Sequence, residues 1–223
     1  MTNYNLGNSS LVETTSHSYL GVEISQDLKW DTHISKVTAS ANKTLGFIRR
    51  NLSSCNKETK ATAYTALVRP TVEYCASVWD PYTNEHIHEI GKIQRRAARM
   101  VCNDYQQTTS ASGLIRSLDW DMLSTRRKIT RVNVSTQSHR GHLALPVSDY
   151  LRPASRFTRR SNTNAYIPYH SRTNCFKNSF VPRTIVDWNS LPPDLQPIKE
   201  VTQFKKSSSE FFRKQDISNN IRD

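Results

Sequence analysis

The chain contains few of the residues from which compact catalytic and metal-binding motifs are built. Only six of its 223 residues are glycine, and none stands in a phosphate-binding loop or a dinucleotide-binding turn. The four cysteines lie too far apart for a zinc knuckle or a disulfide scaffold: Cys55, Cys75, Cys102 and Cys175. No apolar run reaches the length of about 18 residues that a membrane span needs, and the first ten residues have neither the basic nor the apolar region that is typical of a signal peptide. We therefore expect a soluble, intracellular chain without a membrane partner, in the nucleus or the cytoplasm.

The sequence also lacks an arrangement of side chains that indicates catalysis. Two close histidine pairs occur, without a neighbouring set of cysteines or carboxylates: His86 with His88, and His139 with His142. Asp119 and Asp121 flank Trp120 at an expected helix start, where carboxylates cap a helix and favour its dipole. We therefore expect no enzyme activity, no cofactor, no metal and no small-molecule substrate.

Negative charge is scarce. The sequence holds 31 Lys and Arg against 19 Asp and Glu, so the formal net charge is +12 and the pI is about 9.7. Such a balance favours binding to a polyanion. Residues 1 to 28 contain no Lys or Arg, so the basic character belongs to the rest of the chain.

Residues 18 to 24 show the alternation of a half-buried β-strand. Leu20, Val22 and Ile24 alternate with Tyr19, Gly21 and Glu23, which is a period of two. Because an isolated strand is unstable in water, this strand needs a partner, which residues 6 to 15 could supply in a hairpin. We expect a short amino-terminal β-hairpin or strand.

A helical period begins at Asp31, which is expected to be the N-cap. Apolar residues at three- and four-residue steps predict a helix of about 20 residues, from Asp31 to Leu52. Further helical patterns cover residues 57 to 69, 71 to 79, 85 to 102, 114 to 118 and 120 to 134. Between the patterns of residues 57 to 69 and 71 to 79, Pro70 either opens a new helix or kinks the preceding one. The predicted fold is mainly α, a small helical bundle with a short amino-terminal β element and a long irregular basic loop.

Two of these expected helices carry clusters of cations. The candidate residues are Lys92, Arg95, Arg96 and Arg99 in the first, and Arg126, Arg127, Lys128 and Arg131 in the second. Residues 92 to 99 contain no acid, so the four cations there cannot be neutralised by partners one turn away within that run. A solvated basic face and a phosphate-binding track both explain this pattern.

The carboxy-terminal third begins with an irregular stretch. Residues 139 to 178 lack a sustained period, and residues 152 to 183 hold seven cations and no acid. Four aromatic residues are interleaved with them: Phe157, Tyr166, Tyr169 and Phe176. These could stack on bases, or could attach a surface segment to the core. Residues 179 to 195 then predict a short helical cap around Trp188, and residues 201 to 212 a weak amphipathic helix followed by a frayed tail.

Five sequence blocks, in this order and spacing, carry a family resemblance. They are YLGVEISQDLKWDTHI (19 to 34), RPTVEYCASVWDP (69 to 81), IQRRAARMV (93 to 101), LDWDMLSTRR (118 to 127) and SFVPRTIVDWNSLP (179 to 192). Together they resemble the carboxy-terminal part of jockey-type non-LTR (LINE-like) retrotransposon reverse transcriptases. The resemblance spans about residues 18 to 195.

The resemblance implies the region that follows the polymerase palm. On this view, residues 1 to 28 are a terminal palm-like strand segment, 29 to 138 a helical thumb-like domain, 139 to 178 a basic irregular loop and 179 to 223 a helical cap with a frayed tail. In the family, the metal-binding carboxylates lie upstream, partly in an adjacent Asp-Asp pair that this sequence lacks. Because two-metal polymerisation needs such converging carboxylates, we expect a non-catalytic fragment.

Three functions are compatible with the sequence. The first is a thumb and connection region that holds the RNA or DNA backbone of a template-primer through the eight cations, without sequence preference. The second is a decayed retroelement remnant with no selected activity. Residues 131 to 146 are polar where the family usually continues a hydrophobic helix, which suits such decay. The third is a small interaction module that binds a partner helix with the face from Ile34 to Leu52.

Overall fold

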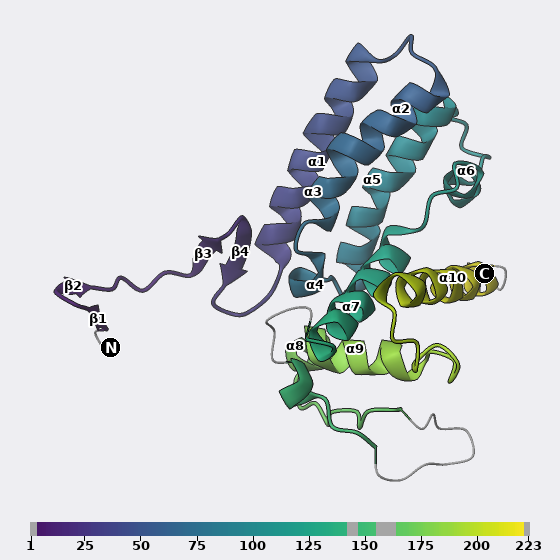
Figure 1. Cartoon of the computed structure of the whole chain (residues 1–223). Coiled ribbons are helices and arrows are strands. Elements are labelled where there is room, and N and C mark those ends of the chain that lie inside the picture. The colour runs from purple at the N-terminus through teal and green to yellow at the C-terminus, as the bar shows by residue number, and fades with distance from the viewer. Residues whose placement is uncertain (1–3, 142–146, 155–163, 221–223) are drawn as a thin grey trace.

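The described part of the polypeptide is mainly helical, with short strands near its amino terminus, as predicted. The computed structural model describes residues 4–141, 147–154 and 164–220 (Figure 1). One group of helices is built around α1 (Asp31–Asn51), α3 (Arg69–Glu73) and α5 (Asn84–Cys102) (Figure 1). Helix α7 (Leu123–His139) connects it to a second group that contains α9 (Phe180–Asn189) and α10 (Val201–Asn220). Within the described ranges, no helix is both long enough and apolar enough to cross a membrane.

The amino-terminal segment forms two small antiparallel hairpins on an extended arm (Figure 1). They are β1 (Asn5–Leu6) with β2 (Ser9–Ser10), and β3 (Ser16–Tyr19) with β4 (Val22–Ser25). The prediction of one strand over residues 18 to 24 is therefore wrong. Leu20 and Gly21 both have positive φ, 47° and 79°, and form a two-residue turn in the middle of that stretch. Such turns suit the twist of a hairpin, and glycine adopts the second conformation without steric cost.

Helix α1 (Asp31–Asn51) follows the predicted period. Its buried residues include Ile34, Ala41, Leu45 and Ile48, which face the first hydrophobic core. These side chains are covered by the neighbouring helices α3 and α5, so they are not free to receive a partner helix. Asp31 is the first helical residue rather than the N-cap, because the carbonyl of Trp30 already accepts the first helical bond, from the Ile34 N–H.

Pro70 is accommodated by a change in helix type. The segments α2 (Lys57–Ala63), η1 (Tyr64–Val68) and α3 (Arg69–Glu73) follow one another directly, and η1 is a π-helical turn. The Arg69 N–H donates to the carbonyl of Tyr64, five residues earlier. Since Pro70 has no N–H and its ring would meet the carbonyl four residues before it, the wider turn removes the conflict. Pro70 therefore lies in the first turn of a new segment.

The first core is completed by helices on both sides of the Asp80–Pro81 turn. They are α4 (Ala76–Trp79), α5 (Asn84–Cys102) and α6 (Ala111–Ser117). The Thr83 hydroxyl caps α5 by accepting the His86 N–H at 3.3 Å. Trp79, Ile90 and Ile93 are fully buried in this core, against the apolar face of α1.

Helix α7 (Leu123–His139) belongs to both groups, because Leu123 lies in the first core and Val132 in the second. It begins three residues after the predicted start and continues through the polar stretch, where Ser135 and Thr136 are buried. The Thr136 hydroxyl donates to the Val132 carbonyl at 2.8 Å, which satisfies it within the helix. The polar residues therefore do not end the helix.

The carboxy-terminal helices pack on α7. They are α9 (Phe180–Asn189) and α10 (Val201–Asn220). The prediction that the chain frays after residue 212 is wrong, since α10 continues to Asn220. Phe204 and Phe212 lie on one side of this helix and are buried against α7 and α9. Trp188 stacks on Phe204. Tertiary burial therefore stabilises a helix that its central serines disfavour.

The predicted basic loop is only partly described. Its described elements are η2 (Val147–Tyr150), a bridge between Pro153 and Tyr166, and α8 (Asn174–Lys177). Tyr166 packs on Trp188, and Tyr169 packs edge-on against Phe176. Residues 142–146 and 155–163 of the predicted loop, which include Phe157, lie outside the described part. Tyr166 and Tyr169 therefore attach this segment to the cluster around Ile185, whereas Phe176 is exposed.

Replacing the buried Gln94 by leucine is expected to lower the free energy of unfolding by about 2 kcal/mol. The Gln94 amide donates to the Asp121 carbonyl at 2.8 Å and accepts the Leu123 N–H at 3.2 Å, so it caps the start of α7 from α5. Urea denaturation followed by circular dichroism measures the loss. The same change at the exposed Gln203 should alter stability by less than about 0.5 kcal/mol. Equal losses at the two positions would exclude a capping role.

Candidate nucleic-acid interface

The cations of α5 do not all lie on one surface. Lys92 and Arg96 are exposed, one turn apart, and Arg99 follows at the next turn on the same side. Arg95 lies apart from this row, where its Nη2 donates to the carbonyl of His88 at 3.1 Å. Burial lowers the pKa of the Arg95 guanidinium. The row of Lys92, Arg96 and Arg99 is therefore the part of the predicted track that faces outward together.

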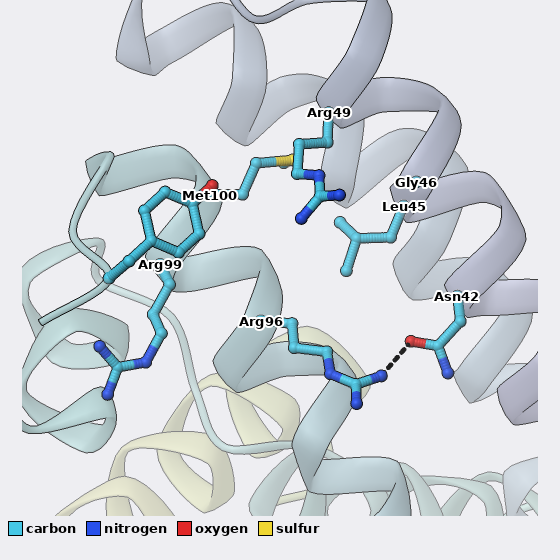
Figure 2. A pocket seen from close by; sticks show the side chains of 8 residues that line it. Asn42, Leu45, Gly46, Arg49, Arg96, Arg99 and Met100 are labelled. Carbon is cyan, nitrogen blue, oxygen red and sulfur yellow. Dashed lines mark hydrogen bonds between the residues drawn. The ribbon is translucent and has the colours of Figure 1, made fainter. Parts of the chain in front are cut away.

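A basic pocket lies between this row and α1. It has a volume of about 400 Å³ and is lined by Asn42, Leu45, Gly46, Arg49, Arg96, Arg99, Met100 and Tyr105 (Figure 2). None of these described lining residues carries a carboxylate. Arg96 reaches across from α5, and its Nη1 donates to the Asn42 Oδ1 of α1 at 2.9 Å (Figure 2). Three arginines from two helices thus line one hollow.

Arg49 is a site residue that the sequence prediction did not include. It is exposed in the last turn of α1, where a positive charge also suits the helix dipole. Its contribution to the pocket depends on the packing of α1 against α5. The sequence showed the positive charge of this turn, but it did not show that α5 would lie across the groove from Arg49.

Arg99 has a second role in holding a loop. Its guanidinium donates to the carbonyls of Gln106 at 2.8 Å and Thr109 at 2.9 Å. These bonds tie the segment that follows α5 to the helix, and Tyr105, within this segment, lines the pocket. Arg99 therefore positions one wall of the pocket in addition to contributing charge.

Only part of the second predicted cluster reaches the surface. Arg126 is partly exposed and forms a two-pronged ion pair with Glu73, whose carboxylate raises the pKa of the guanidinium. Lys128 is half-buried on the same helix. Arg127 and Arg131 are 4% and 1% exposed, so the expectation that they contact phosphate is wrong for these two residues.

The two buried arginines belong to an ion network that joins both groups of helices. The Arg127 Nε donates to the Asp80 Oδ1 at 2.7 Å, and Arg131 pairs with both Asp80 and Asp187. The Nη1 of Arg183 lies 3.1 Å from the Asp80 Oδ2. Burial lowers the pKa of Arg127 and of Arg183, and the Asp80 carboxylate opposes this effect. Asp80 and Asp187 are thus shared among three arginines inside the protein, and these ion pairs join α7 to the segments packed on it.

The part of the chain that the structure describes gives no support for a metal site. There, no group of three His, Cys, Asp or Glu side chains lies close enough together to hold a metal ion. His86, one of the candidate metal-binding histidines, instead lies 3.1 Å from the Asp31 carboxylate through its Nε2. His139 and His142 lie outside the residues whose side chains are described.

The surviving candidate is the basic groove, which we define as Arg49, Lys92, Arg96 and Arg99 with the pocket between α1 and α5. It combines exposed charge with a hollow of small-molecule size. Comparisons with protein-family models, with curated proteins and with solved structures give no match to this chain, so its resemblance to the reverse transcriptases stays a prediction.

Proposed function

We propose that the chain binds the sugar-phosphate backbone of RNA or DNA through the basic groove, without sequence preference. The observation that supports this function is the convergence of Arg49, Arg96 and Arg99 on one pocket without a carboxylate among its described lining residues. Guanidinium groups pair well with phosphate because they offer several donors in one plane. Backbone contacts of this kind position a protein on nucleic acid but carry no sequence information.

The proposal agrees with the charge of the whole chain and with its family resemblance. A net charge of +12 attracts a polyanion over distances of about a Debye length, and the groove then provides local contacts. A thumb-like region of a retrotransposon reverse transcriptase would hold a template-primer in this way. The proposed function is therefore that of a non-catalytic binding fragment of this type.

Reversing the charge of Arg96 is expected to weaken binding to a duplex about tenfold and to reduce the slope of log affinity against log salt by about one. The reason is the loss of one phosphate contact and its released counterion. Fluorescence anisotropy with an RNA–DNA hybrid of about 20 base pairs, between about 50 and 200 mM salt, measures both quantities. Two unrelated hybrid sequences should show the same loss for Arg96→Glu.

The matched control is Lys206→Glu, which changes the net charge equally on the exposed side of α10. We expect it to change affinity less than about twofold, because long-range attraction is screened at these salt concentrations. Equal effects of the two variants would indicate attraction by net charge alone and would refute binding in the groove. Circular dichroism of both variants establishes that they remain folded.

A further inference from the structure

We propose that the pocket of the basic groove receives an unpaired nucleotide, so that the chain binds single strands more tightly than blunt duplexes of the same length. This inference rests on the proposed function and adds a preferred form of nucleic acid to it. It follows from the difference between the interior of the pocket and its mouth.

The interior of the pocket is apolar and open. Leu45 of α1 and Met100 of α5 are nearly fully buried and form its floor (Figure 2). Gly46 lies beside Leu45 and contributes no side chain. A Cβ at this glycine would meet only the Arg50 Nη1 within 4 Å, at 3.6 Å, so the space above the backbone is free. An apolar hollow of about 400 Å³ is suited to a flat, largely apolar ring such as a nucleobase.

An aromatic side chain borders the hollow. Tyr105 lines the pocket with 55% of its surface exposed, from the loop that Arg99 ties to α5. Exposed aromatic rings bind bases by stacking, and this contact tolerates any sequence because every base has a π-face. Hydrogen bonds at Gln106 and Thr109 already hold this loop in place. The loss of conformational entropy when the ring binds a base is therefore smaller.

The mouth of the pocket carries the charges that a strand requires. Arg49 lies on the α1 side and Arg96 on the α5 side, so phosphates on either flank of an inserted base would each meet a guanidinium (Figure 2). A paired base cannot enter, because its ring is stacked within the duplex and withdrawing it carries an energetic cost. Charge at the mouth and apolar surface in the interior therefore select an unpaired nucleotide.

The first test compares single-stranded and blunt duplex DNA of about 20 nucleotides by anisotropy, with the intact chain. We expect the single strand to bind about tenfold more tightly, and Tyr105→Ala to remove most of this difference while changing duplex affinity less than about twofold. Equal affinities of the wild-type chain for the two probes would overturn the inference. A chain that binds neither probe would refute the proposed function itself.

The second test fills the pocket without changing its charge. Gly46→Met places a side chain in the free space, and we expect it to reduce single-strand affinity about tenfold with little effect on the duplex. Gly46→Ala is the matched control and should bind like the wild type, because one methyl group makes only an ordinary contact there. If Tyr105→Ala and Gly46→Met both leave the preference unchanged while Arg96→Glu weakens both probes, phosphate binding stands and the nucleotide pocket is refuted.

A competition experiment distinguishes a strand from a free nucleotide. Adenosine monophosphate offers the same base and phosphate but lacks the neighbouring phosphates that span Arg49 and Arg96. We expect it to displace the single strand only at concentrations at least about a hundredfold above the dissociation constant of the strand. Displacement at a concentration similar to that constant would overturn the assignment to a strand.

Discussion

Replacing Asp80 by asparagine is expected to lower the free energy of unfolding by about 3 to 5 kcal/mol, which is the usual effect of removing one partner from a buried ion pair. Asp80 is 7% exposed and faces the guanidinium groups of Arg127, Arg131 and Arg183. Asparagine keeps the shape but removes the charge. Arg131 would keep its pair with Asp187, whereas Arg127 would lose the carboxylate to which its Nε donates. Urea denaturation at neutral pH measures the loss.

An exposed aspartate provides the control for this experiment. Asp194→Asn makes the same chemical change at a residue on the surface, and should alter stability by less than about 0.5 kcal/mol. A loss below about 1 kcal/mol for Asp80→Asn would show that water or rearranged side chains compensate the buried arginines. The network would then not be what holds the two groups of helices together.

Replacing Trp79 by alanine is expected to have an effect of similar size, about 3 to 5 kcal/mol. Trp79 is fully buried in the first core, its Nε1 donates to the Tyr74 carbonyl at 2.8 Å, and its ring meets His33 edge-on at 5.0 Å between centroids. Alanine would leave a cavity and an unpaired carbonyl at once. Thermal unfolding followed by circular dichroism should show a markedly lower midpoint.

Phenylalanine at the same position separates the two contributions. Trp79→Phe keeps most of the apolar volume and removes the hydrogen bond, so we expect a loss of about 1 to 2 kcal/mol. If alanine and phenylalanine destabilise the chain equally, the hydrogen bond rather than the packing of Trp79 dominates. That result would contradict the expected order.

The helices were predictable where their signal is local. The apolar period of α1 predicted a helix from Asp31 to Leu52, and it covers Asp31–Asn51. Residues 85 to 102 were predicted as a helix, and α5 covers Asn84–Cys102. In both helices the buried residues recur on one face, so the amphipathic period alone places the element.

The elements predicted wrongly are those that depend on distant partners. The alternation of apolar and polar residues runs without a break through the two-residue turn of Leu20 and Gly21. The pattern therefore did not reveal that this turn separates β3 from β4. Helix α10 continues beyond the predicted end because Phe204 and Phe212 are buried against other helices. The serines at its centre have a low intrinsic preference for a helix.

The candidate site shows the same division. The spacing of Lys92, Arg96 and Arg99 predicted one side of a helix, and all three lie on it. Arg127 and Arg131 have the same residue types and spacing as surface cations, yet they are buried against carboxylates 47 and 56 residues away in the sequence. Nothing in their local sequence distinguishes a buried arginine from an exposed one.

The sequence by itself determined that this chain is basic, mainly helical and rich in outward-facing cations on α5, because composition and periodicity are local properties. Only the tertiary structure decided which cations are neutralised inside the protein and which gather around a pocket. The reason is physical: an arginine becomes a structural residue or a binding residue according to the charges and surfaces that other segments bring to it. The Asp80 carboxylate makes Arg127 a structural residue, and the packing of α1 on α5 makes Arg49 part of the pocket.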